Sequence, residues 1–385
     1  MMNLNQKNLK EDFKDLEKSL KEGDAGWYLL KTRGWESLPD GDVDVKIPKD
    51  SGVKTLKGLK YCTGNIICFS SSLTTLEGSP ASCKSFEIRG AKSLKSLEGG
   101  PLCVKGGLSS ETSIGDDYYC LYRISQYDIV SGKESFIGGD YVICNCGIVN
   151  AIGVPKYIGG HFYLSDNSKL ITLLGASDTI VCGSVVVNNT GIRNLQGLPK
   201  KIKKGLDCSD NSNFSSFEGS SNAIIGGSLV CRNTKIRSTL GFPKIKRSVD
   251  LCNNEQLVSI NNCTVGVEKD LNVSNTSINS FEGLIIVDNN GEPIDNNMER
   301  KLGQLFVENC SNLTSFKGCA YDVKNLYFGK NESLTSFTDF PNVVGFLYVN
   351  EKKNNFPNFS LKNMKSMESK IALGEGKIKI FSSDD

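Results

Sequence analysis

The chain has 385 residues, of which 38% are hydrophobic, so it is long enough to bury a sizeable core and we expect it to fold. Lysine and arginine total 45 against 43 aspartate and glutamate residues, and a net charge of +2 does not favour nucleic acid or an anionic membrane as a partner. The amino terminus is polar, and no run of about 18 apolar residues occurs. We therefore expect a cytoplasmic protein.

The first segment of the chain has the spacing of an amphipathic helix that ends at Gly23. Its apolar positions are Leu4, Leu9, Phe13, Leu16 and Leu20. Because the repeats that follow need their apolar end covered, residues 1–52 are predicted to form a helical cap. An independent recognition element is the alternative.

Residues 53–350 repeat a short pattern with a period near 21, which predicts a solenoid. The pattern reads apolar, two polar, apolar, polar, glycine, as in Leu73–Gly78 and Phe214–Gly219. With the second apolar residue as the marker, successive repeats lie 20 to 23 residues apart. This series is Ile152, Leu173, Leu195, Phe217, Leu240, Ile260 and Phe281.

About half a period after each marker comes a triplet of apolar, any and apolar residues, which we interpret as a strand. Alternation directs the outer two side chains inward and the middle one outward. The triplets are Phe162–Leu164, Val185–Val187, Leu206–Cys208, Leu229–Cys231, Val249–Leu251, Leu271–Val273, Leu305–Val307, Leu326–Phe328 and Leu347–Val349. Asn or Asp follows many of them, where its side chain can bond the backbone. The fold class predicted is a mainly β solenoid of about a dozen irregular coils around one parallel sheet.

Two intervals exceed the period, which predicts insertions near residues 110–135 and 282–304. The interval from Leu97 to Ile152 is too long for two regular coils. The second insertion contains a predicted turn at residues 288–293. Residues 351–385 are predicted to form a carboxyl-terminal cap and polar tail, with a closing strand or hairpin near its end.

The sequence offers little catalytic chemistry. It has one histidine, His161, and no glycine-rich nucleotide-binding loop, so we expect no enzyme, no metal and no cofactor. The 14 cysteines are scattered, which favours free buried thiols, and Cys144 with Cys146 is only a weak metal signal. Asp207 and Asp250 leave open a carboxylate pair of the kind that cleaves glycosides, although solvated charge is the simpler interpretation.

The repeats resemble a known family. Leu206-x-Cys208-x-x-Asn211, preceded by Ile202 and followed by Phe214, is similar to the leucine-rich repeat, and the resemblance covers about residues 53–350. The pattern is also similar to S-L-E-G-x-P repeats of bacteriophage and bacterial proteins. The resemblance implies protein binding and, for a bacteriophage protein, a place in the host cytoplasm. Glycine and proline between the strands predict turns or extended segments there instead of helices.

The middle residues of the triplets form one outward column, and its last three members are aromatic. We predict that Phe306, Tyr327 and Tyr348 form a protein-docking patch, with Tyr163 at a distance, because aromatic residues are enriched in interface cores. The alternative is that residues 282–304 or the carboxyl-terminal segment cover them.

Three classes of function follow from these features. The first is a non-catalytic scaffold that binds a protein, such as a bacteriophage protein that engages or inhibits a host protein. The second is a structural component of a virion or another assembly, for which self-association is expected. The third is a β-helix that binds or cleaves carbohydrate.

Overall fold

The computed structural model describes residues 14–101, 103–104, 136–334, 339–350 and 377–381. It divides into two compact units, Met1–Thr190 and Gly191–Asp385, and each is described here by itself. The predicted insertion near 110–135, most of the predicted carboxyl-terminal cap and the beginning of the predicted amino-terminal helix lie outside the described residues.

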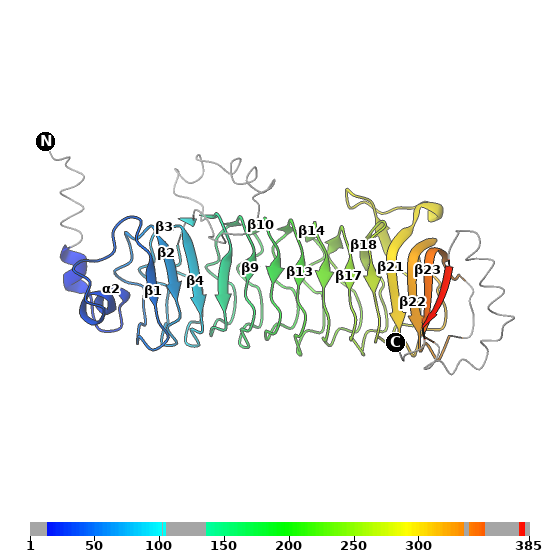
Figure 1. Ribbon diagram of the computed structural model, residues 1–385, viewed down its shortest axis with the longest axis horizontal. Coiled ribbons are helices and arrows are strands. Elements are labelled where there is room, and N and C mark those ends of the chain that lie inside the picture. The colour runs from blue at the N-terminus through cyan, green and yellow to red at the C-terminus, as the bar shows by residue number, and fades with distance from the viewer. Residues whose placement is uncertain (1–13, 102, 105–135, 335–338, 351–376, 382–385) are drawn as a thin grey trace. The chain divides into compact units, whose positions relative to one another are not determined.

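Both units are parallel β-solenoids, and over the residues that the structure describes they wind through about 13 coils (Figure 1). The predicted fold class is therefore confirmed. Each coil contributes a strand to a long sheet, and most contribute a second short strand to a narrow sheet. Stacking is necessary because one coil cannot bury its own apolar side chains.

The first unit begins with a small helical segment that lies against the first coil. Residues 14–19 are helical, followed by α2 (Ala25–Trp27) and the π-helical turn η1 (Tyr28–Thr32). Thr55 donates a hydrogen bond to the Asp24 carboxylate over 2.7 Å, and the Gly26 amide donates to the Lys57 carbonyl over 2.7 Å. A Cβ on Gly58 would lie 2.5 Å from the Gly26 Cα, so glycine permits this close approach.

The strands of the first unit pair in parallel throughout. Its long sheet contains, in this order, β1 (Val45–Ile47), β2 (Asn65–Cys68), β4 (Ser85–Arg89), β7 (Tyr141–Cys144), β9 (Phe162–Tyr163) and β11 (Val185–Val186). Its narrow sheet contains β3 (Ser82–Cys83), β5 (Cys103–Val104), β6 (Phe136–Ile137), β8 (Tyr157–Ile158) and β10 (Ile180–Val181). The narrow sheet is built from segments between the long-sheet strands. Glycine and proline predicted that these segments would be turns or extended chain instead of helices.

The second unit repeats this arrangement. Its long sheet contains β13 (Leu206–Asp207), β15 (Leu229–Val230), β17 (Val249–Asp250), β19 (Leu271–Asn272), β21 (Lys301–Glu308), β22 (Asp322–Gly329), β23 (Asn342–Asn350) and β24 (Lys377–Phe381). The other strands are β12 (Lys201–Ile202), β14 (Ile224–Ile225) and β16 (Lys244–Ile245) in a narrow sheet, and the pair β18 (Thr264–Gly266) and β20 (Ile285–Val287). The closing strand predicted near the carboxyl terminus is β24, and it pairs in parallel with β23.

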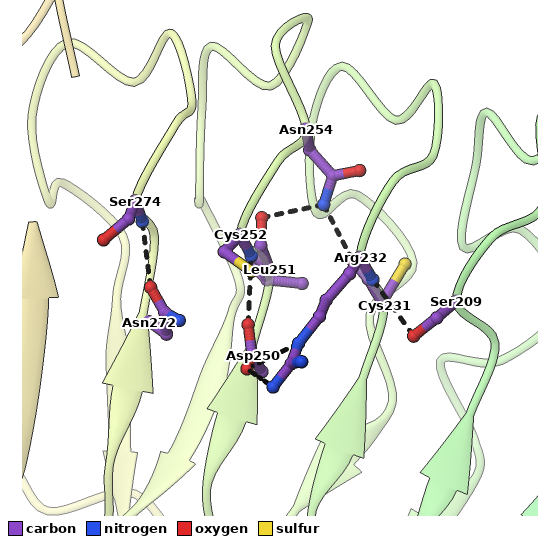
Figure 2. A network of polar contacts seen from close by, with 9 residues as sticks. All are labelled: Ser209, Cys231, Arg232, Asp250, Leu251, Cys252, Asn254, Asn272 and Ser274. Atoms are coloured by element: carbon purple, nitrogen blue, oxygen red, sulfur yellow. Dashed lines mark hydrogen bonds and ion pairs between the residues drawn. The ribbon is translucent and has the colours of Figure 1, made fainter. Parts of the chain in front are cut away.

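The chain leaves many of the long-sheet strands through two polar positions with different roles. The first is a left-handed corner with φ between 52° and 61°, held by Asn145, Asp166, Asn189, Asp210, Asn233, Asn253, Asn275 and Asn309. Asn and Asp tolerate this conformation better than other side chains. The second position is buried: Asn167, Asn211, Asn254 and Asn331 are all 0% exposed. These buried amides bond backbone groups between the coils, as shown for Asn254 in Figure 2.

The marker series derived from the sequence needs two corrections. Ile152 and Leu240 are 36% and 70% exposed, whereas the residues before them, Ala151 and Thr239, are buried at 0%. The Thr239 hydroxyl donates to the Asn261 carbonyl over 2.7 Å, which satisfies its buried oxygen. With Ala151 and Thr239 as markers, successive coils from Ala151 to Phe281 are 21 or 22 residues long, which is more regular than the sequence series.

The two interruptions also differ in detail from expectation. The Leu97 amide donates to the Ile152 carbonyl over 3.0 Å, so these residues lie in adjacent coils. The interval between them along the chain is therefore one coil with a long insertion instead of two coils with a shorter one. In the second interruption, the predicted turn is present: the Asp288 carboxylate accepts from the Asn290 and Glu292 amides. Strand β20 pairs in parallel with β18 as the second strand of a regular coil, so the added residues lie between β20 and β21 and include the short 3-10 helix η2 (Asn297–Glu299).

Candidate binding surface

The structure brings Phe306, Tyr327 and Tyr348 together in one column. They lie on the neighbouring strands β21, β22 and β23, and the register places Phe306 beside Tyr327 and Tyr327 beside Tyr348 (Figure 1). All three side chains are partly exposed, while the residues on either side of Tyr327, Leu326 and Phe328, are 0% exposed. Alternation along the strand thus produces the outward column that the sequence predicted.

The three rings stack on one another. The ring centroids of Phe306 and Tyr327 are 4.3 Å apart at an interplanar angle of 12°, and those of Tyr327 and Tyr348 are 4.4 Å apart at 4°. Phe346 adds a tilted ring 5.9 Å from Tyr348. Because each inner ring face is covered by the next ring, the column presents mainly ring edges and the two hydroxyl groups.

Stacking also changes the electrostatics of the central tyrosine. Burial, followed by the nearby Tyr348 hydroxyl and Asp270, raises the pKa of Tyr327 above its ordinary value. Tyr327 is therefore a neutral hydrogen-bonding group at physiological pH. A rigid strip of apolar ring edges with neutral hydroxyls is suited to contact with a protein surface, since tyrosine supplies contact area with few rotatable bonds.

Three other outward residues of the same sheet are polar and are engaged by their own chain. Asp207 accepts a hydrogen bond from the amide two residues later at 3.0 Å, and Asp250 and Asn272 do the same at 3.1 Å each, as Figure 2 shows for the latter two. The Asp250 carboxylate also forms an ion pair with Arg232, whose Nε lies 2.8 Å away. Strand β15 separates the strands of Asp207 and Asp250 in the register. These contacts give both carboxylates a structural role.

Tyr163 has different neighbours, in the first unit. Its ring stacks on the single histidine, His161, with centroids 5.5 Å apart. The His161 Nδ1 accepts from the Ser184 amide over 3.1 Å, and the His161 amide donates to Asp140 over 2.6 Å. Tyr163 is partly exposed, and burial is the main cause that raises its pKa. His161 therefore helps to hold the adjacent coils together.

Twelve cysteines whose side chains the structure describes are free, and ten of these are buried. Cys208 and Cys231 directly follow the paired strands β13 and β15 and are 0% exposed, as the sequence predicted. Burial raises the pKa of Cys68 to about 11 and that of Cys146 to about 12. Within the described residues, no cluster of three or more His, Cys, Asp or Glu side chains is arranged to hold a metal ion.

A shallow polar groove follows the left-handed corners of the second unit, and the sequence analysis did not predict it. The lining residues are Asn233, Asn253, Glu255, Asn275, Thr276, Ser277, Asn309 and Ser311. Its corner amides bond one another, with Asn275 donating to Asn253 over 2.7 Å and Asn309 donating to Asn275 over 2.8 Å. These bonds link successive coils along the groove.

Comparisons with protein families, with curated proteins and with solved structures found no match to this chain. Among the described residues, no helix has the length and apolar character needed to cross a membrane.

Proposed function

We propose that this protein is a non-catalytic scaffold that binds another protein through the column of Phe306, Tyr327 and Tyr348. The observation that carries the proposal is the in-register stack of three partly exposed aromatic rings on a rigid parallel sheet. Such a column is already ordered before binding, so little side-chain entropy is lost when a partner covers it. Tyr163 is proposed as a secondary contact.

The hydrogen bonds of the candidate catalytic side chains support binding over catalysis. Asp207 and Asp250 are committed to hydrogen bonds of their own chain, and His161 accepts a backbone amide. A glycosidase needs two carboxylates aimed at one bond, with one of them able to donate a proton. We therefore place a protein partner ahead of carbohydrate.

The setting is part of the same proposal. The resemblance of the repeats to leucine-rich repeats, and to S-L-E-G-x-P repeats of bacteriophage and bacterial proteins, supports a bacteriophage protein that engages or inhibits a host protein in the host cytoplasm. A structural component of a virion or other assembly is the second candidate, because stacked solenoids offer long surfaces for self-association.

The proposal is tested by affinity capture of the tagged protein from a bacterial lysate, with mass spectrometry of the bound proteins. The variant Phe306→Ala/Tyr327→Ala/Tyr348→Ala removes the column. The matched control is Tyr321→Ala, which removes an aromatic side chain that is 43% exposed in the same unit but outside the column. We expect one stoichiometric partner, retained by the control and lost by the triple variant. Recovery of only the protein itself or of particle components would favour the assembly role.

A further inference from the structure

Four exposed aliphatic side chains lie together on the third side of the first unit, between the long and narrow sheets. Val149 and Ile152 are each 36% exposed, and Ile171 and Leu174 are each 52% exposed. The Ile171 amide donates to the Val149 carbonyl over 3.2 Å, and the Ala151 amide donates to the Leu174 carbonyl over 3.0 Å. The four side chains therefore belong to two adjacent coils, and we call them the aliphatic patch.

These positions are polar in the coils that precede and follow the patch in sequence, and Leu240 and Val258 are exposed aliphatic residues at such positions in two later coils. Each coil has two such positions, one directly after each of the two buried residues of the repeat pattern. The coil before the patch in sequence holds Lys95 and Glu98 there, and the coil after the patch holds Arg193 and Gln196. Nothing in the backbone requires aliphatic residues there, because the polar coils form the same turn. Adjacent exposed apolar side chains with polar neighbours mark interaction sites more often than single ones do.

The charged side chains beside the patch indicate which partner binds to it. The Val149 amide donates to the Lys95 carbonyl over 3.2 Å, so the coil of Lys95 and Glu98 is the next one in the stack. Both side chains are exposed. The third side thus carries two columns: Lys95, Val149 and Ile171 in the first, and Glu98, Ile152 and Leu174 in the second.

We propose that the aliphatic patch binds a second copy of this chain, with a two-fold axis that runs along the stack between the two columns. This symmetry places the first column of one copy opposite the second column of the other. Val149 then meets Ile152, Ile171 meets Leu174, and Lys95 meets Glu98 of the second copy. The surface therefore complements itself, because aliphatic side chains meet aliphatic side chains and Lys95 meets Glu98. A partner of another kind would not require this self-complementarity.

The patch is small, so the dimer is weak. Interfaces below the standard size are transient, and we expect a dissociation constant on the order of 100 µM. Sedimentation velocity from about 5 µM to about 1 mM covers this range. The wild-type protein is expected to shift from monomer to dimer across it.

The variants use residues that the repeat itself tolerates. Ile171→Arg/Leu174→Gln copies the adjacent coil and is expected to raise the dissociation constant at least about tenfold. Leu240→Gln is the control for the loss of an exposed aliphatic side chain, because Leu240 is 70% exposed and lies outside the patch, with polar Arg237 in its own coil and Val258 as the exposed aliphatic side chain of the adjacent coil. This control is expected to dimerise like the wild type. Far-UV circular dichroism verifies that each variant is folded.

The charge pair tests the symmetry. Lys95→Glu alone places two glutamates face to face, and Glu98→Lys alone places two lysines face to face, so each variant is expected to dimerise several-fold more weakly. An equimolar mixture of the two variants restores opposite charges and is expected to regain wild-type association. A wild-type protein that stays monomeric across the range overturns the proposal. So does a patch variant that dimerises like the wild type, or a mixture that associates no better than its components. Because the aromatic column is unaltered in all of these variants, the outcome is independent of the capture experiment above.

Discussion

Replacement of Asn254 by alanine is expected to destabilise the second unit more than any exposed substitution nearby. The Asn254 amide donates to the carbonyls of Cys231 and Leu251 over 2.7 and 2.8 Å (Figure 2). Its oxygen accepts from the amide and hydroxyl of Thr234 over 2.9 and 2.6 Å. Alanine leaves at least three buried backbone groups without these partners. Each such group costs about 1–3 kcal/mol, and partial entry of water lowers the sum to about 3–5 kcal/mol.

The control for this prediction is Asn253→Ala at the adjacent left-handed corner. Asn253 is exposed with φ of 59°, so alanine there costs about 1–2 kcal/mol of backbone strain. Urea denaturation of each variant, followed by far-UV circular dichroism, gives the two midpoints. We expect the larger shift for Asn254→Ala. If Asn253→Ala shifts the midpoint as much or more, the buried amide does not hold the coils together as described.

Two further predictions concern close packing and buried thiols. Gly183→Ala is expected to cost about 3 kcal/mol because the new Cβ would lie 2.3 Å from the Gly160 carbonyl oxygen. Gly34→Ala meets no atom within 4 Å and is expected to cost only about 1–2 kcal/mol, from a side chain at φ of 70°, so equal thermal midpoints for the two variants would refute the clash. Burial raises the pKa of Cys68 from 9.0 to about 11, so the thiol stays neutral in the fold while the unfolded thiol ionises. Stability is therefore expected to fall as pH rises from 9 to 11, a loss that Cys68→Ala reduces, and an unchanged pH dependence in that variant would contradict the assignment.

Much of the fold follows from the sequence because stacked coils share one register. A residue such as Phe306 follows its counterpart Asn272 by 34 positions, yet alternation within each strand still places it in the outward column. The same rule aligned Tyr327 and Tyr348. Stacking of their rings did not follow from the sequence, because ring orientation depends on neighbouring side chains that a repeat pattern does not describe.

Other features were missed because residue type and burial do not always agree. The nearest apolar residue was taken as the buried marker, which fails where the marker is small or polar, as at Ala151 and Thr239. The resulting misassignment of Ile152 to the core hid the aliphatic patch. Similarly, Asn253 and Asn254 are both asparagines, but Asn253 lies exposed at a left-handed corner, whereas Asn254 is buried and forms hydrogen bonds with the backbone. Only the coil geometry distinguishes the two residues.

The most direct test of the proposed function is site-specific photo-crosslinking at the aromatic column. Tyr327→p-benzoylphenylalanine places a photoreactive ring at its centre, and the same residue in place of Val258, which is 47% exposed in the same unit, provides the control. In a bacterial lysate, irradiation is expected to link one partner protein at position 327 and not at position 258. If the partner is captured but crosslinks only at position 258, or at neither position, the aromatic column is not the binding surface.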